Sequence, residues 1–187
     1  MEYQEIENIF SKLKRLHKQS QRLNGEGTSW SINFPNNENC KYIIKKFRDF
    51  ESIQDDIENY LIWLWNLKDY FKSISNDKQL VEKYVNNNYH LTILADIANS
   101  LKHSKLNNSR SGVFPILGKL TVTLDQKNMS QITFYANEVE LEPKDVNAAE
   151  LTLPIIDKNG NNLIDLFDLL KFVEEKWVNF ASSIKVV

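Results

Sequence analysis

The sequence predicts a mainly α-helical bundle with a small antiparallel β-sheet inserted before the C-terminal helix. Three observations lead to this prediction. Apolar residues recur every three or four positions through residues 2–23, 41–75 and 89–106, which is the spacing of one helix face. Between residues 117 and 156 the apolar residues alternate instead, as is typical of strands. Helical spacing then returns near the carboxyl end.

The first helix is predicted over residues 2–23. Its apolar face would consist of Ile6, Ile9, Phe10, Leu13 and Leu16. The glycines in residues 24–27 end this helix. In the segment that follows, Trp30, Ile32 and Phe34 alternate with polar residues. This pattern indicates either a short strand or an apolar plug lying on the bundle.

The longest helix is predicted over about residues 41–75. Its apolar residues step by three and four through Phe47, Phe50, Ile53, Ile57, Leu61, Leu64, Leu67, Phe71 and Ile74. Trp63 and Trp65 widen this face beyond what one neighbouring helix can cover, which predicts a homodimer. A strand anywhere in residues 45–75 would contradict this interpretation of the fold.

Asn76 and Asp77 are expected to cap a shorter helix that continues through Val85, and a further helix is predicted over residues 89–106. Three strands are then expected, around residues 117–124, 132–141 and 151–156. A closing helix follows from Leu163 to Phe180. We expect one domain over residues 1–187, made of a helical bundle (1–112), a β insertion (113–157) and the closing helix (158–187).

The composition narrows the possible functions. The chain has 187 residues and a net charge of -2, which argues against binding nucleic acid through a broadly basic surface. Cys40 is the only cysteine, so no intramolecular disulfide can form and a cysteine-based metal site is not expected. We predict neither a metal nor a cofactor. The polar amino terminus and the shortness of the longest apolar run, residues 60–65, predict a cytoplasmic protein with no membrane partner.

The candidate site lies on the predicted helix 89–106. Asp96, Asn99 and His103 fall on one stripe of this helix. A carboxylate and an amide can orient a histidine, which titrates near neutral pH and is the usual general acid or base. The alternative is a solvated polar face, with His103 interacting favourably with the dipole at the helix C-terminus.

The segment Asp96-Ile97-Ala98-Asn99-Ser100-Leu101-Lys102-His103 resembles the last core helix of the HEPN-type helical proteins of bacteria and archaea. The segment Trp65-Asn66-Leu67-Lys68-Asp69-Tyr70 resembles an aromatic-rich stretch on the preceding long helix of the same group. The resemblance covers roughly residues 45–110. It implies a helical bundle that often dimerises and that, in active members, is a metal-independent ribonuclease.

Active members of that family carry an arginine, an adjacent polar residue and a histidine four residues after the polar one. Asn99 and His103 match the last two, but Ala98 stands where the arginine is expected. In the family the arginine stabilises the charge of the scissile phosphate. Lys102, Lys105 or Arg110 could bind phosphate in its place only if the backbone brings them to that position.

Two functions therefore compete. The first is a ribonuclease-like protein of bacterial stress response or phage defence, in which Asp96, Asn99 and His103 act on RNA. The second is a non-catalytic module that dimerises and binds a protein partner or a small ligand. The departure at Ala98 favours the second function, while the match at Asn99 and His103 supports the first.

Overall fold

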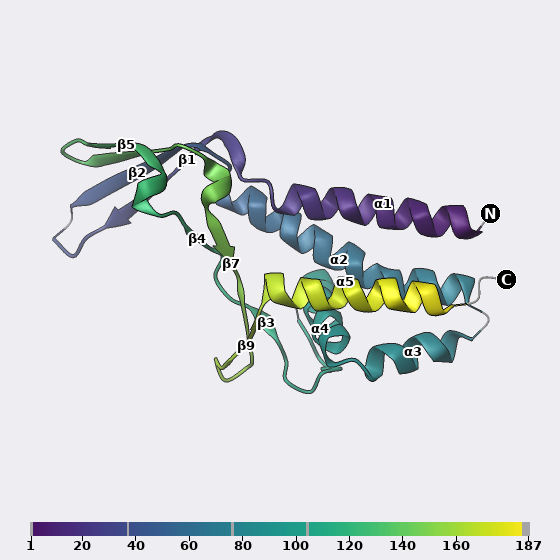
Figure 1. The fold of residues 1–187 in the computed structure, drawn as a ribbon. Coiled ribbons are helices and arrows are strands. Elements are labelled where there is room, and N and C mark those ends of the chain that lie inside the picture. The colour runs from purple at the N-terminus through teal and green to yellow at the C-terminus, as the bar shows by residue number, and fades with distance from the viewer. Residues whose placement is uncertain (1, 37, 76, 104, 185–187) are drawn as a thin grey trace.

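The structure is a computed structural model that describes residues 2–36, 38–75, 77–103 and 105–184 (Figure 1). These residues form five α-helices and three β-sheets, with 50% of the chain in helix and 26% in strand. The protein is therefore a mixed α/β protein. The predicted mainly α-helical, HEPN-like bundle with one small inserted sheet is wrong.

The helices pack side by side in one half of the molecule, and the largest sheet extends away from them (Figure 1). The α-helices are α1 (Glu2–Ser20), α2 (Phe50–Ile74), α3 (Lys78–Asn86), α4 (Tyr89–His103) and α5 (Leu166–Ser183). The strands are β1 (Asn24–Asn33), β2 (Asn39–Phe47), β3 (Ile116–Leu117), β4 (Thr121–Thr123), β5 (Met129–Phe134), β6 (Glu138–Pro143), β7 (Glu150–Thr152), β8 (Pro154–Ile156) and β9 (Asn162–Asp165).

The main correction concerns residues 41–47, which were expected to begin the long helix. They belong to strand β2, so the condition that contradicts the predicted fold is met at residues 45–47. The helix begins only at Phe50, where the Asp49 side chain accepts a hydrogen bond from the Ser52 backbone N–H. The apolar residues of 41–47 fit both a helix and a strand, and pairing with β1 and β6 decides for the strand.

The strands are also arranged differently from the predicted insertion. The largest sheet has the order β1-β2-β6-β5, with β2 and β6 parallel and the other two pairs antiparallel. It thus combines a hairpin that precedes α2 with a hairpin from residues 129–143. The remaining strands form the sheets β3-β8-β9 and β4-β7, and β9 occupies the start of the predicted closing helix.

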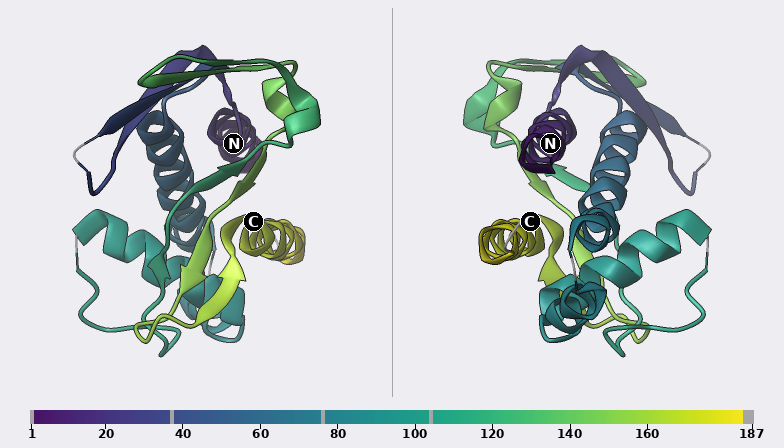
Figure 2. Two further views of the ribbon diagram at one scale, coloured as in Figure 1. Left: turned by 90° about the vertical axis from the view of Figure 1, so that its left-hand side faces the viewer. Right: turned by 90° about the vertical axis from the view of Figure 1, so that its right-hand side faces the viewer.

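Helix α2 is the centre of the helical half, where α1, α3 and α4 all pack against it (Figure 2). Its apolar stripe is buried as predicted, with Ile53, Leu61, Leu67 and Phe71 fully buried. Burial of each such side chain contributes about 1.5–3 kcal/mol to stability. The stripe therefore supplies much of the apolar burial that stabilises the helical half.

The surplus apolar face expected on this helix is covered within the chain. Trp65 is only 2% exposed. The ammonium group of Lys12 on α1 lies 3.1 Å from the ring centroid of Trp63. Trp65 is therefore covered within the chain, and Trp63 is half-buried beneath Lys12. Little of the apolar face from which the homodimer was predicted remains exposed at these two residues.

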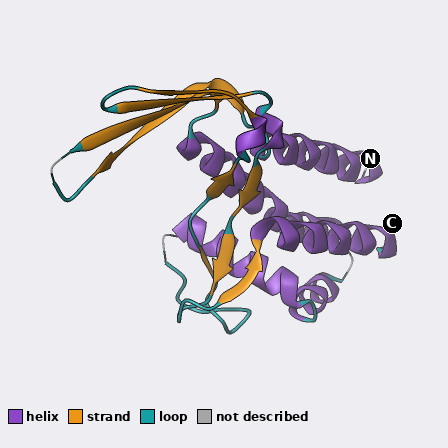
Figure 3. Ribbon diagram, turned by 60° about the vertical axis from the view of Figure 1, so that its left-hand side comes forward, coloured by secondary structure: helices purple, strands orange, loops and turns teal. Residues whose placement is uncertain are grey.

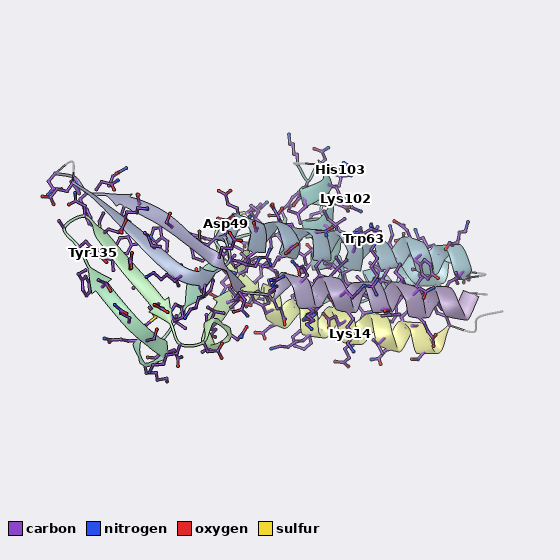
Figure 4. The ribbon with its side chains drawn as sticks, turned by 90° about the horizontal axis from the view of Figure 1, so that it is seen from above. Lys14, Asp49, Trp63, Lys102, His103 and Tyr135 are labelled. Atoms are coloured by element: carbon purple, nitrogen blue, oxygen red, sulfur yellow. The ribbon has the colours of Figure 1, made fainter. Side chains whose placement is uncertain are left out.

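The large sheet projects beyond the helices as an arm (Figure 3). Ile44 anchors its inner end in the core, while Tyr135, at the turn between β5 and β6, lies far from the helices (Figure 4). Within the described ranges, no helix is both long and apolar enough to cross a membrane.

Candidate functional site

Asp96 is a structural carboxylate in this fold. Its side chain is completely buried and accepts hydrogen bonds from the Ser109 hydroxyl (2.7 Å) and the Arg110 backbone N–H (2.7 Å). It also accepts from the backbone N–H (2.9 Å) and the hydroxyl (2.6 Å) of Ser111. These four bonds hold the loop that follows α4 against the helix, so the carboxylate is not available to orient His103.

The other residues of the predicted stripe do not converge with Asp96. His103 is exposed at the last position of α4, and Asn99 is half-buried. Neither forms a hydrogen bond with Asp96 in the part of the chain that the structure describes. The exposed position of His103 matches the alternative of a solvated helix end near the helix dipole.

The three predicted phosphate-binding residues are separated from one another. Lys102 donates a hydrogen bond to the side-chain oxygen of Asn66 (2.7 Å). Lys105 is exposed and lines a separate pocket of about 480 Å³ with Phe114. Arg110 forms an ion pair with Glu82 (2.6 Å). The structure therefore does not bring the six predicted residues into one site.

A different cavity, which the sequence did not predict, lies between α1, α2 and α5. Its volume is about 510 Å³, within the usual range for small-molecule sites. It is lined by Phe10, Leu13, Lys14, His17, Lys18, Gln21, Tyr60, Leu64, Glu174, Trp177 and Val178. Lys14 and His103 lie on opposite sides of the helical half (Figure 4), so this cavity is separate from the predicted site.

Three polar side chains meet in the wall of this cavity. The His17 Nδ1 lies 2.6 Å from Glu174 Oε1, and the Tyr60 hydroxyl donates to the same oxygen at 2.5 Å. The His17 Nδ1 and the Tyr60 hydroxyl are 3.3 Å apart. When His17 carries its proton on Nδ1, the carboxylate accepts both bonds. The side chain of Gln21, which also lines the cavity, interacts with the same imidazole.

The three pKa values are shifted together. The hydrogen bond to Glu174 raises the pKa of His17 above its ordinary value of 6.5. Burial acts to raise the pKa of Glu174, but hydrogen bonds from His17 and Tyr60 outweigh burial and lower it. Burial, with the bond to Glu174, raises the pKa of Tyr60. At neutral pH the cavity wall therefore contains a carboxylate, a phenol that keeps its proton and a histidine that protonates readily.

The helices place these groups by ordinary helical spacing. On α1, Phe10, Leu13 and His17 follow one another at three and four residues and share one face. On α5, Glu174 precedes the fully buried Trp177 by three residues. The indole N–H of Trp177 has no hydrogen-bond partner among the described residues, which is unusual for a buried donor.

The cavity continues along the helices. A second hollow of about 600 Å³ shares Phe10 and Val178 with the first. It is lined by Ile6, Glu7, Phe10, Val178, Ala181, Ser182 and Ile184. The two hollows adjoin at Phe10 and Val178, between α1 and α5. Their lining is mostly apolar; the His17–Tyr60–Glu174 cluster lies in the first hollow, and Glu7 and Ser182 line the second. We call the two hollows together the α1–α5 groove.

The sequence contained a signal for this site. His17 lies on the apolar stripe of α1, and Tyr60 lies on the apolar stripe of α2 between Ile57 and Leu64. A polar group within an apolar stripe must find a partner when the stripe is buried. The partner of His17, Glu174, is 157 residues away in the sequence, so helical spacing alone does not identify it.

No family model, curated protein or solved structure matches this chain. The chemistry of the α1–α5 groove must therefore be inferred from its own residues. Ser182 lines the second hollow of the groove. The first hollow, of about 510 Å³, is lined by no serine, threonine or cysteine, so it offers no side-chain nucleophile of these types. It does offer apolar contact, two lysines and a hydrogen-bonded histidine.

Proposed function

We propose that this protein is a ligand-binding module. Its ligand is a small amphiphile with an apolar body and one anionic group, bound in the α1–α5 groove. This proposal follows the second of the two functions expected from the sequence. The observation that carries it is the cavity of about 510 Å³, in which an apolar wall ends at a cluster of cationic and hydrogen-bonding groups.

The apolar wall supports binding of the body of the ligand. Phe10, Leu13, Leu64 and Trp177 surround the space from three helices. A ligand body that buries about 200 Å² of apolar surface would gain about 5 kcal/mol before the cost of immobilisation. With one polar interaction of about 1 kcal/mol added, the gross gain of about 6 kcal/mol corresponds to a dissociation constant of about 40 µM. The cost of immobilisation moves it toward roughly the high-micromolar range.

The cationic groups support the negative charge on the ligand. Lys14 and Lys18 line the cavity, and neither forms an ion pair with a described residue. Glu174 already accepts hydrogen bonds from His17 and Tyr60, and a protonated His17 balances its charge. A carboxylate or phosphate of the ligand would therefore interact with Lys14 and Lys18 at the rim, rather than with Glu174.

The ribonuclease-like function has less support. It requires Asp96, Asn99 and His103 to act together, and Asp96 instead holds the loop at Ser109–Ser111. We also propose a cytoplasmic location, because the only cysteine, Cys40, leaves the fold without an intramolecular disulfide.

The proposal can be tested with a fluorescent anionic amphiphile, 8-anilinonaphthalene-1-sulfonate. We expect saturable binding that decanoate displaces and that decanol displaces less well, since decanol has the same apolar body without the charge. Replacing Val178, which is 51% exposed at the groove, with Trp should fill the space and reduce binding of both competitors. Failure of decanoate to compete up to about 1 mM would contradict the proposal.

A pair of charge variants tests the anionic group. The double variant Lys14→Gln/Lys18→Gln should weaken decanoate binding by roughly tenfold and leave decanol binding unchanged, since two rim interactions of about 0.5–1 kcal/mol are lost. The matched control is Lys78→Gln/Lys83→Gln on α3, which removes the same charge away from the groove. If both double variants lost decanoate binding equally, the change in net charge of the protein would explain the loss, and Lys14 and Lys18 would have no specific role in the groove.

A further inference from the structure

Strand β1 forms an open edge of the arm. The sheet order places β1 and β5 at the two edges, with β2 and β6 inside. β1 is ten residues long, and its last five residues, 29–33, are all exposed. The backbone groups on the outer edge of such a strand are free to pair with another strand.

The charges of the sheet lie on the interior strands. Three lysines of β2 pair with three glutamates of β6, in the pairs Lys41–Glu138 (3.6 Å), Lys45–Glu140 (2.8 Å) and Lys46–Glu142 (2.7 Å). β1 carries only Glu26, and β5 carries no charge. Proteins usually place charges on edge strands to prevent pairing with other chains. The edge strands of this sheet lack that protection. The lysines of β2 are already paired with glutamates, so they do not favour binding of nucleic acid to the sheet.

One face of the arm is apolar up to the β1 edge. The register places Trp30, Tyr42, Val139 and Phe134 in one row across all four strands. Trp30 stacks on Tyr42, with ring centroids 5.5 Å apart and an interplanar angle of 10°. Trp30 nevertheless remains 37% exposed, and the next residue on its face, Ile32, is 41% exposed. Both can contact apolar side chains of an added strand.

We infer that β1 pairs with β1 of a second copy of this chain. The segment Thr28-Ser29-Trp30-Ser31-Ile32 is nearly symmetrical about Trp30. Antiparallel pairing centred there sets Trp30 beside its own copy, Ser29 beside Ser31, and Thr28 beside Ile32. Aromatic pairs and β-branched pairs are favourable cross-strand neighbours. Glu26 then lies opposite Phe34, so no like charges meet.

The pairing joins two four-stranded sheets into one twofold-symmetric sheet. The contact of one edge strand with the flanking aromatic residues would bury roughly 400–500 Å² per copy, which is below the ~800 Å² of a standard interface. We therefore expect a weak dimer, with a dissociation constant of roughly 10–100 µM. This inference does not depend on the α1–α5 groove, which lies between other elements.

Sedimentation velocity on the full chain tests the inference. The unaltered protein should shift from monomer to dimer as its concentration rises to about 200 µM. The variant Ser29→Lys/Ser31→Lys should stay monomeric, because two pairs of lysines would face each other across the twofold axis. The variant Ser29→Glu/Ser31→Lys should still dimerise, because each glutamate then faces a lysine of the other copy. Circular dichroism checks that both variants fold.

The other edge strand supplies a matched control. The variant Gln131→Lys/Thr133→Lys adds the same charges to β5 and should dimerise like the unaltered protein. The inference is overturned if the unaltered chain stays monomeric at ~200 µM, if the β5 variant loses the dimer, or if both β1 variants behave alike. Growth into larger oligomers would also overturn it, because β1–β1 pairing closes at two copies.

Discussion

The replacement of Asp96 with Asn separates a structural role of this carboxylate from a chemical one. The carboxylate accepts four hydrogen bonds from the loop after α4, two of them from backbone N–H groups. Three of these bonds end on Oδ2, and the one from the Arg110 N–H ends on Oδ1. An amide that keeps its oxygen at the Oδ2 position turns its NH₂ group toward the Arg110 N–H, so one charge-assisted bond is lost and buried donors face each other. At about 1.5 kcal/mol for the lost bond and about as much for the unpaired donors, the free energy of unfolding should fall by about 3 kcal/mol.

Urea unfolding followed by circular dichroism measures this loss directly. For a chain of this length the melting temperature should fall by roughly 6–12 °C. The control Asp55→Asn changes an exposed carboxylate on α2 and should shift stability by less than about 0.5 kcal/mol. A double-mutant cycle with Ser111→Ala should show coupling of about 1 kcal/mol or more, since Ser111 bonds to Asp96 through both its backbone and its hydroxyl.

An Asp96→Asn variant as stable as the unaltered protein would refute this reasoning. It would mean that the loop at residues 109–111 does not depend on the buried carboxylate. Loss of a measurable activity without loss of stability would instead support the role that the sequence suggested for Asp96, which is to orient His103 for acid–base chemistry.

Three further predictions concern single side chains. His103→Ala should change stability by less than about 0.5 kcal/mol, because the exposed imidazole contributes only a weak interaction with the helix dipole; a larger change in urea unfolding would contradict its exposed position. The raised pKa of His17 means that its interaction with Glu174 stabilises the fold fully below pH 6.5, and the lowered pKa of Glu174 means that the same interaction is fully present above pH 4.5. The stability lost in His17→Gln should therefore be largest between these two pH values, and it should decline as pH rises through the His17 pKa. Equal loss at pH 5.5 and pH 9 would show that the pair does not titrate as inferred. The hydrogen bonds from Lys72 and Arg110 outweigh burial and lower the pKa of Glu82 to about 2. Glu82→Gln should therefore lower the free energy of unfolding by about 1 kcal/mol at neutral pH, and by progressively less as pH falls from 4.5 toward 2. Thermal unfolding across that pH range measures this loss.

The positions of most helices could be predicted because their signals are local. The three-and-four spacing of apolar residues identified the central part of α2, and its members Ile53, Leu61 and Phe71 are buried as expected. Asp77 caps α3, with its side chain accepting from the Gln79 and Leu80 backbone N–H groups. The alternation of Trp30 and Ile32 correctly indicated a strand as one of two options.

The errors occurred where a distant segment decides the local structure. Residues 41–47 have an apolar pattern that either a helix or a strand could use, and β6, which comes much later in the chain, pairs with them as a strand. The pattern around residues 132–141 suggested one strand, but a turn after Phe134 divides it into the β5–β6 hairpin. Pairing between strands is set by the packing of the whole chain, and single-segment periodicity does not contain it.

The same distinction applies to function. The sequence by itself determined which residues lie on each helix face, and it showed that Asp96, Asn99 and His103 share a stripe. Only the tertiary structure decided that Asp96 is buried beneath a loop while His17 meets Glu174 across 157 residues. A hydrogen bond requires two groups within about 3 Å, and groups on different elements reach that distance only when the elements pack together. Helical spacing identifies the face on which a polar group lies, and packing determines the partner that it meets.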